Sequence, residues 1–554
     1  MIKETPIKLS HNEEIKAANP TLAGTIAATI DDANAEHFSD DDNQFLKFHG
    51  SYQQDDRDLR KTGKKYIMMV RGRIPGGVMT AKQWCVFDEL ATKYGNGTLR
   101  MTTRQSIQFH GILKSGLRPL IKSINESLLS TLAACGDVNR NVMASPTPAY
   151  TKARESVVAD ARTVAMALAP RTQAYHSIWI DGVQLENEAP ENKNFVDPLY
   201  GQTYLPRKFK IGFVIPPVND MDVFTNCLGF IAIVENDQLV GYNVAVGGGM
   251  GRSHGNTQTF PRLADVIGFI TPDKVVEVAK AVLTIHRDFG DRADRKHERL
   301  KYVVEERGVA FMQEEVNKRA GVALAPAKPY RFTTTADLLG WHKATDGKWF
   351  LGLFVETGRV KNEQKIALRE VAEKFPGIEF RLSANQNVIL ANVTAEDKAA
   401  ITSLLHAHGV KTENQASLLH AAGMACPSLP TCGLGLAESE RMLPGMIDRV
   451  QTLCDEVGLS NEEIIIRSTG CPNGCARPYM AELAFVGKAP GRYQVWLGGN
   501  TSGTRLNRIW KDVIKEADLE NELRPVLVRF AKERNTAERF GDWCDRVFLN
   551  ETKN

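Results

Sequence analysis

The sequence lacks the apolar segments that would direct a protein to a membrane or anchor it there. Residues 1–14, M-I-K-E-T-P-I-K-L-S-H-N-E-E, contain no hydrophobic stretch of the kind found in a signal peptide. No later run approaches the roughly 18 apolar residues that a membrane span needs. These absences predict a cytoplasmic protein without membrane contact. The 554 residues, 43% of them hydrophobic, are enough for several domains, each with its own core.

Nucleotide-binding fingerprints are also missing. Neither G-x-G-x-x-G at the start of a helix nor G-x-x-x-x-G-K-[ST] occurs in the chain. The glycine run at 247–251, G-G-G-M-G, continues into R-S-H without the dinucleotide pattern. We therefore do not expect the chain to bind a nicotinamide dinucleotide, and hydride chemistry would need another protein.

An excess of charge of one sign and a disulfide framework are absent as well. The chain has 69 basic and 66 acidic residues, and its formal net charge of +3 argues against a general nucleic-acid role. Nine cysteines in a chain of this length do not indicate a disulfide framework. Thiolates that hold a metal are best assembled in a reducing compartment, which again favours the cytoplasm.

Four of the cysteines form two tight pairs in the C-terminal third. Cys426 and Cys432 lie in C-P-S-L-P-T-C, and Cys471 and Cys475 lie in C-P-N-G-C. Four converging thiolates are the usual requirement for an iron–sulfur cluster. A structural zinc site is the alternative, but zinc ribbons favour two-residue gaps, and these gaps are five and three. Cys454 instead falls on an apolar helical face and is expected in the core.

An internal duplication organises the chain. Four segments of the N-terminal half have a counterpart in the C-terminal half. Residues 66–70 correspond to 349–355, and a helix from about residue 80 corresponds to one near 365–374. Residues 97–109 correspond to 377–390, and 241–249 correspond to 492–500. Arg100 and Gln105 keep the separation of five that is found between Arg381 and Gln386. Each copy is expected to contain a strand, a helix and a strand. The result would be a pseudo-symmetric α+β molecule with a cofactor between its halves.

Two stretches carry polar side chains at strand spacing. The first contributes four even-numbered residues, Arg100, Arg104, Gln108 and His110. One continuous strand would place all four on one face. Lys208 and Lys210 share a face by the same two-residue offset. From periodicity alone, ordinary solvated strand faces are the alternative for both stretches.

The cysteine pattern and several further motifs resemble one enzyme family. C-x5-C followed after 38 residues by C-x3-C is similar to the signature of the sulfite and nitrite reductases that couple a [4Fe–4S] cluster to siroheme. The similarity includes Y-Q-Q-D-D-R-D (52–58), R-I-P-G-G (73–77), R-Q-S-I-Q-F-H-G (104–111), N-R-N (139–141), L-P-R-K-F-K (205–210) and G-G-G (247–249). From about residue 45 to 545 the chain resembles the haemoprotein subunits of assimilatory NADPH-dependent sulfite reductases.

This resemblance implies two cofactors, siroheme and a [4Fe–4S] cluster. It implies that Cys426, Cys432, Cys471 and Cys475 hold the cluster, and that Cys475 is also the axial ligand of the siroheme iron. The residues that match the family's siroheme contacts are Arg100, Arg104, Gln105, Gln108, His110, Gly247, Gly248, Gly249 and Asn473. The residues that match its sulfite-binding and catalytic positions are Arg71, Arg140, Lys208 and Lys210.

The reaction implied by the resemblance is the six-electron reduction of sulfite to sulfide, in sulfate assimilation and cysteine biosynthesis. The implied electron donor is a separate FAD/FMN flavoprotein subunit that oxidises NADPH, and ferredoxin is the plant-type alternative. A siroheme nitrite reductase is a second interpretation, which Lys210 opposes because nitrite enzymes resemble L-P-R-K-x-N at that point. A non-catalytic electron carrier or a zinc scaffold is the third, and it would not need the four cations.

The duplication and the resemblance together predict five segments. These are an extended N-terminal arm (1–64) that is acidic at 40–42, two paired ferredoxin-like half-domains (65–145 and 331–415), a siroheme-binding α+β domain (146–330) and a second α+β domain with the cluster cysteines (416–554).

Overall fold

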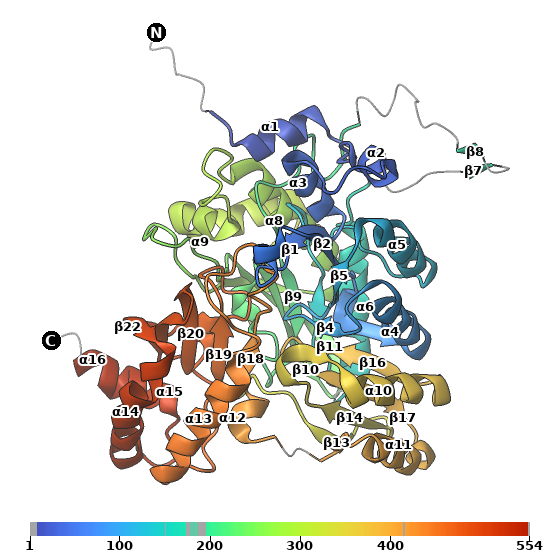
Figure 1. The fold of residues 1–554 in the computed structure, drawn as a ribbon. Helices are drawn as coiled ribbons and strands as arrows, with labels where there is room; N and C mark the ends of the chain where they lie inside the picture. The colour runs from blue at the N-terminus through green and yellow to red at the C-terminus, as the bar shows by residue number, and fades with distance from the viewer. Residues whose placement is uncertain are drawn as a thin grey trace.

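A computed structural model describes residues 8–149, 151–172, 195–413 and 416–551, together with the backbone of two short strands, β7 (Trp179–Ile180) and β8 (Val183–Gln184). In this part of the chain, helices surround four five-stranded sheets (Figure 1). The four sheets fall into two pairs of matching topology, which confirms the predicted α+β class and its duplication. None of the described helices is long and apolar enough to cross a membrane.

Two of the sheets belong to the ferredoxin-like half-domains. The first has the order β1 (Ser51–Asp55), β2 (Tyr66–Arg71), β5 (Ile107–Ile112), β4 (Leu99–Met101) and β15 (Arg359–Val360). The second has the order β13 (Gly340–Lys343), β14 (Trp349–Leu353), β17 (Val388–Val393), β16 (Glu379–Leu382) and β3 (Val78–Thr80). Each sheet ends in a strand from the other half, because β15 pairs with β4 and β3 pairs with β16. Neither half-domain is therefore complete alone.

Four helices accompany these two sheets and agree with the predicted strand–helix–strand pattern. They are α4 (Ala81–Tyr94), α5 (Leu117–Glu126), α10 (Asn362–Lys374) and α11 (Ala395–Ala407). Helix α4 begins after a capping box formed by Thr80 and Gln83, where the sequence places its start. Trp84 of α4 stacks on Phe380 of the second sheet, with 4.5 Å between ring centres. One hydrophobic core thus extends through both half-domains.

The other two sheets form the larger domains. The third sheet has the order β12 (Asp265–Ile270), β11 (Gln238–Val246), β10 (Leu228–Glu235), β9 (Ile211–Val214) and β6 (Met143–Ala144). The fourth has the order β22 (Arg508–Lys515), β21 (Arg492–Leu497), β20 (Leu483–Ala489), β19 (Ile466–Thr469) and β18 (Met424–Ala425). In the third sheet β6, β9 and β10 run parallel, and in the fourth β18, β19 and β20 do. The two remaining strands of each sheet pair antiparallel, β10 with β11 and β11 with β12 in the third, and β20 with β21 and β21 with β22 in the fourth. The echo between 241–249 and 492–500 therefore reflects equivalent strands, β11 and β21.

Each larger domain has its own helices and its own core. The helices of the first are α6 (Thr151–Ala167), α8 (Val275–Phe289) and α9 (Leu300–Ala320), and those of the second are α12 (Leu418–Ala421), α13 (Leu443–Glu456), α14 (Leu519–Glu533), α15 (Phe540–Trp543) and α16 (Leu549–Glu551). Cys454 on α13 is fully buried in the second core, where burial raises the pKa of its thiol to about 12. This confirms its predicted place in the core.

The N-terminal segment differs from the predicted extended arm. It contains three helices, α1 (His11–Ala18), α2 (Ile26–Asp31) and α3 (Asp40–Phe48), before β1 joins the first sheet. The acidic residues 40–42 form the first turn of α3, which Ser39 caps by accepting a hydrogen bond from the N–H of Asp42. The prediction of an extended arm is wrong because acidic residues behind a serine are also a helix-start signal.

Candidate functional site

The polar stretch at residues 100–110 is a hairpin, which corrects the prediction of one continuous strand. Strands β4 and β5 pair antiparallel around a turn at 102–106, where Gln105 has a left-handed backbone with φ of 50°. Arg104 lies in this turn, so it does not share a strand face with Arg100, Gln108 and His110 as predicted. Arg100 lies opposite Gln108, because the hairpin pairs these two residues. Their shared face therefore arises across two strands instead of along one.

A row of polar residues crosses the first sheet. Arg71 on β2, Gln108 on β5 and Arg100 on β4 are paired one after another in adjacent strands. Side chains paired in this way point to the same face of a sheet. The Gln108 amide oxygen accepts a hydrogen bond from Arg71 Nε at 3.1 Å. The His110 ring nitrogen lies 3.3 Å from the same amide, and burial lowers the pKa of His110 to about 3.

Arg100 and Gln105 are engaged by the protein itself. The buried guanidinium of Arg100 donates to Glu440 Oε2 at 2.9 Å and to the carbonyl oxygen of Ala425 at 2.8 Å. The Gln105 amide exchanges two hydrogen bonds with the backbone of Ala144, at 2.7 and 2.9 Å. Both side chains thus link the first half-domain to the larger domains. Their contact with siroheme stays a prediction.

The four cysteines follow two neighbouring parallel strands. Cys426 comes directly after β18, and Cys471 lies just beyond the end of β19. Parallel strands bring their carboxyl ends to one edge of a sheet, so the two cysteine pairs meet there. The Gly470 N–H lies 3.4 Å from the Cys426 sulfur, and the Asn473 amide nitrogen lies 3.4 Å from the Cys471 sulfur. Asn473 therefore contacts a predicted cluster ligand.

Three of the four thiols have raised pKa values. Burial, and then the charge of Cys475, raises the pKa of Cys471 to about 12. The same two causes raise the pKa values of Cys426 and Cys432. Within the described residues, no group of three His, Cys, Asp or Glu side chains could hold a single metal ion between them. Four mutually repelling thiolates, two of them with N–H groups directed at sulfur, are a donor set that fits an iron–sulfur cluster.

The predicted sulfite-binding cations lie around Cys475. Burial lowers the pKa of Lys208 to about 7 and lowers that of Lys210 well below its usual range, while the charge of Cys475 opposes both shifts. Burial also acts on Arg71, but negative charges that include Cys475 raise the pKa of this residue. Neither lysine's ammonium group has a hydrogen-bond or ion-pair partner in the described part of the chain. Both lysines are partly buried, and charges shielded from water without partners are costly, so these ammonium groups fit an anionic ligand.

Residues 139–141 run beside the two lysines. The Arg140 N–H donates to the carbonyl oxygen of Phe209 at 2.9 Å, and its Nε donates to the carbonyl oxygen of Gly136 at 2.7 Å. Phe209 is fully buried between Lys208 and Lys210, which leaves the lysines on the opposite side of the chain. The side-chain amide of Asn139 is buried without a partner among the described residues, so this segment also offers polar atoms to a ligand.

Sequence reasoning missed further cations in this region. They are Arg207, Arg252, Arg299 and Lys301. The charge of Arg299 lowers the pKa values of Lys208 and Lys301, and burial is the larger cause in both. The Nε atoms of Arg104, Arg252 and Arg299 are buried and unpartnered among the described residues. Such donors fit siroheme, a tetrapyrrole with many carboxylates. A signal was available, since five of the ten residues at 292–301 are Lys or Arg.

The glycine run at 247–249 is required by close packing. A Cβ on Gly248 would lie 2.0 Å from the carbonyl oxygen of Phe224. A Cβ on Gly249 would lie 2.9 Å from a terminal nitrogen of Arg299, and Gly247 has a positive φ of 88°. The run therefore holds β11 against the segments that carry the cations, and its own contact with siroheme stays a prediction.

A buried ion-pair network that the sequence did not reveal joins the two halves beside Cys475. Asp222 and Arg477 both have left-handed backbones, and both precede the short helix that leads into β10 or β20. Asp222 Oδ2 accepts hydrogen bonds from Arg477 Nε and from a terminal nitrogen of Arg467, each at 2.6 Å. Arg477 also donates to a backbone oxygen in the turn of each half-domain, at 3.2 and 3.1 Å. Because Arg477 is two residues from Cys475, this network holds the Cys475 loop in place.

Comparisons with known proteins agree with this geometry. A family model described as the nitrite/sulfite reductase ferredoxin-like half domain matches residues 60–127 and 342–408. Another, described as the nitrite and sulphite reductase 4Fe-4S domain, matches residues 159–324. The chain is 48% identical to the "Sulfite reductase [NADPH] hemoprotein beta-component" of Staphylococcus saprophyticus, covering 98% of this chain and 96% of that protein. This chain belongs to the nitrite and sulphite reductase family.

A second relative and a solved structure agree with this membership. The protein of the same name from Geobacillus kaustophilus is 48% identical, with 97% of this chain and 95% of that protein covered. The structure of Mycobacterium tuberculosis NirA has a TM-score of 0.80 at 22% identity and covers 97% of this chain and 96% of its own. That likeness supports the nitrite and sulphite reductase fold. The 4Fe-4S family model matches the first larger domain, whereas the cysteine pairs lie in the second.

Proposed function

We propose that this chain is the haemoprotein component of an assimilatory sulfite reductase, which reduces sulfite to sulfide with siroheme and a [4Fe–4S] cluster. The observation that carries the proposal is the position of Cys475. Its charge acts on the other three cysteines and also on Arg71, Lys208 and Lys210. A cluster and an anion pocket therefore adjoin at one residue. Relatives named sulfite reductase, at 47–48% identity, favour sulfite over nitrite as the substrate.

The residues around Cys475 suit the demands of this reaction. Reduction of the sulfite dianion to hydrosulfide takes up six electrons and seven protons and releases three water molecules. Siroheme and the cluster, when bound through Cys475 and its three partners, would supply single electrons. Arg71 and Arg140 keep their charge and hold the oxyanion. Lys208, with a pKa of about 7, can hold or release a proton near neutral pH.

The electrons come from a separate flavoprotein subunit, with FAD and FMN, that oxidises NADPH. The absence of dinucleotide fingerprints supports this division of labour, and so do the words NADPH and beta-component in the names of the relatives. We place the reaction in the cytoplasm, because a cluster held by cysteine thiolates is best assembled in a reducing compartment.

Turnover of the purified chain with two electron donors tests the function. With reduced methyl viologen, a one-electron donor, the chain loaded with siroheme and cluster is expected to produce sulfide from sulfite. With NADPH alone it is expected to be inert, because nothing in the chain accepts a hydride. NADPH-driven turnover in the absence of flavoprotein would contradict the proposal, as would a failure to reduce sulfite with methyl viologen.

The affinity for sulfite is expected to fall as the pH rises above 7. Lys208 binds the dianion only when protonated, and its protonated fraction decreases through a pKa of about 7. The KM for sulfite should then rise by up to about tenfold per pH unit on the alkaline side. In Lys208→Arg the charge persists, so its pH profile should be flatter than that of the wild type. The ionisation of sulfite itself is common to both proteins and cancels in their ratio; identical profiles would refute the role of Lys208.

A further inference from the structure

Two of the four cluster cysteines can be reached from outside the protein core. Cys426 and Cys471 are buried, Cys432 is partly buried and Cys475 is exposed. Cys475 opens toward the cations that we assign to sulfite. Cys432 lies in the loop 427–435, next to the exposed residues 433 and 434 of the same loop. The substrate and the electron donor therefore have separate approaches to the cluster, and the Cys432 side is open to a donor.

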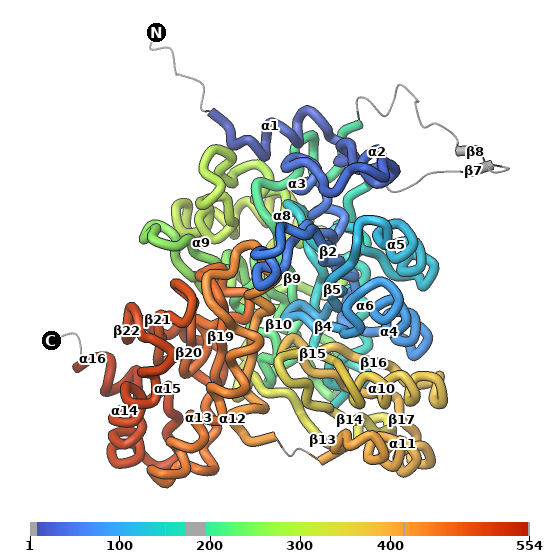
Figure 2. Tube along the Cα trace, in the orientation of Figure 1, coloured from blue at the N-terminus to red at the C-terminus, as the bar shows by residue number. Residues whose placement is uncertain are grey.

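The surface over Cys432 is built from two segments that are distant in sequence. Arg57 donates from its backbone N–H to the carbonyl oxygen of Pro430 at 3.2 Å. Its guanidinium donates to the carbonyl oxygens of Gly433 and Gly435, each at 2.7 Å. Figure 1 and Figure 2 both show the blue segment around β1 beside the orange cluster loop. Residues 57–65 and 433–434 thus form one continuous face, which we call the Cys432 face.

Apolar and basic side chains are both exposed on the Cys432 face. Leu59 is 51% exposed and Leu434 is 67% exposed, although large apolar residues are usually covered. Lys61 and Lys65 are exposed and form no ion pair within the described residues. Apolar anchors with uncompensated positive charge beside them are the composition of a docking surface for an acidic partner.

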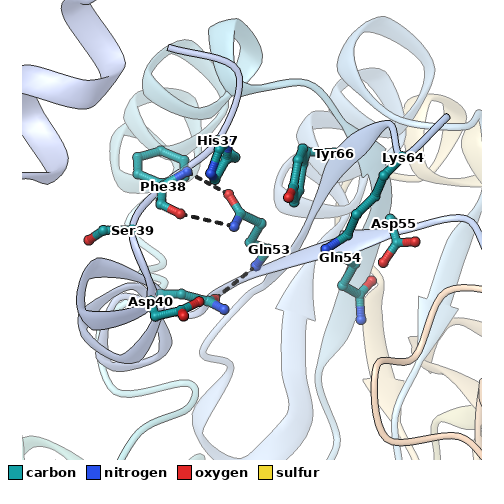
Figure 3. Close-up of a pocket in the computed structure, with 10 residues that line it drawn as sticks. His37, Phe38, Ser39, Asp40, Gln53, Gln54, Asp55, Lys64 and Tyr66 are labelled. Carbon is teal, nitrogen blue, oxygen red and sulfur yellow. Dashed lines mark hydrogen bonds between the residues drawn. The ribbon is translucent and has the colours of Figure 1, made fainter.

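A cleft of about 390 Å³ adjoins this face. His37, Asp40, Gln53, Lys64 and Tyr66 are among the residues that line it (Figure 3). The His37 ring stacks on Tyr66 with 4.7 Å between ring centres, and the Lys64 ammonium lies 4.7 Å from the centre of the Tyr66 ring. The cleft gives the face a recess into which a partner side chain can insert.

We propose that the Cys432 face is the docking surface for the electron donor, a flavin carrier whose flavin is surrounded by acidic side chains. The inference rests on the proposed function, since only a reductase needs such a donor. Electron transfer slows steeply with distance, so the donor must dock where a cluster ligand comes near the surface. Transient electron-transfer complexes bury little area, and a face of this size is sufficient for one. The free lysines would speed the encounter and make it sensitive to salt.

Two variants of the Cys432 face test the proposal. Leu59→Glu replaces an exposed apolar anchor by a charge that repels an acidic partner, and Lys61→Glu/Lys65→Glu reverses the free basic charge. Met166→Glu, at a residue of α6 that is 72% exposed, and Lys82→Glu, at an exposed residue of α4, are matched controls away from this face. For each protein we would measure sulfite reduction driven by NADPH at increasing concentrations of the flavoprotein subunit, sulfite reduction driven by reduced methyl viologen, and the optical spectrum.

Both face variants are expected to need at least about tenfold more flavoprotein for half-maximal rate. Their methyl viologen activity and spectrum should match those of the wild type and of both controls. Unchanged flavoprotein dependence would overturn the docking proposal, and so would a parallel loss of methyl viologen activity or of cofactor. If the wild type self-associates and Leu59→Glu separates the copies, the face is a contact between copies of this chain and the proposal is wrong. The proposed function fails separately, if the wild type with methyl viologen does not reduce sulfite.

Discussion

Cys475→Ser is expected to abolish sulfite reduction and to remove most of the iron and inorganic sulfide from the purified protein. A serine hydroxyl does not replace a thiolate as a soft ligand for iron, and without iron the remaining three thiolates would have no positive charge to offset their mutual repulsion. The same loss is expected for Cys426→Ser, whose sulfur is buried and faces the Gly470 N–H. Iron and acid-labile sulfide per chain, together with the optical spectrum, measure the effect.

Cys454→Ser is the matched control for these cysteine variants. Its thiol is buried in the core around α13 and takes no part in the site around Cys475. The control should therefore keep full cluster and siroheme. Retention of a complete cluster in Cys426→Ser would show that the ligand assignment is wrong, and loss of cluster in Cys454→Ser would show that the assay reports misfolding.

Asp222→Asn is expected to destabilise the protein by about 3–5 kcal/mol, because it leaves two buried guanidinium groups without a counter-charge. Arg467 and Arg477 both donate to the same carboxylate oxygen. Burial alone would raise the pKa of Asp222, but the charges of these two arginines outweigh it and lower the pKa below its usual value. The free energy of unfolding in urea is the measurement. Siroheme content should fall with it, because the network holds the loop that contains Cys475.

Asp220→Asn makes the same chemical change two residues away and serves as the control. Burial, and then the charge of Asp337, raises the pKa of Asp220 to about 8, so its carboxyl group is neutral at pH 7. It accepts one hydrogen bond, from the Ser145 hydroxyl at 3.1 Å, which an amide oxygen can also accept. The cost should therefore stay within about 1 kcal/mol. Equal destabilisation by the two substitutions would show that the charge of Asp222 does not matter.

Features that depend on local spacing were accessible from the sequence. The repeat of Arg100 and Gln105 in Arg381 and Gln386 predicted equivalent segments in the two halves, and the structure gives both glutamines positive φ. Gln386 donates to the backbone of Ala425 as Gln105 does to its counterpart in β6. The cysteine pairs, likewise, are short motifs at the ends of two parallel strands, and adjacent parallel strands bring such motifs together.

Features that depend on distant partners were not accessible. Asp222 and Arg477 are 255 residues apart, and no sequence motif around either residue predicts that the two form an ion pair. The single-strand interpretation of residues 100–110 failed because alternation alone does not reveal a turn, and Gln105 is not a residue type that commonly marks a left-handed position. The helices of the N-terminal segment were missed because their short apolar faces are completed by residues from other domains.

The exchange of β3 and β15 between the half-domain sheets means that the first sheet cannot be completed until much of the chain has been synthesised. Strand β4 leaves the ribosome long before β15, so its edge stays unpaired until about 260 further residues have been made. Unpaired strand edges are templates for association with other chains. The first half of the nascent chain should therefore depend on chaperones, and a fragment that ends before residue 359 should aggregate rather than fold. The cofactors, whose cysteines come later still, can enter only a molecule that is already joined.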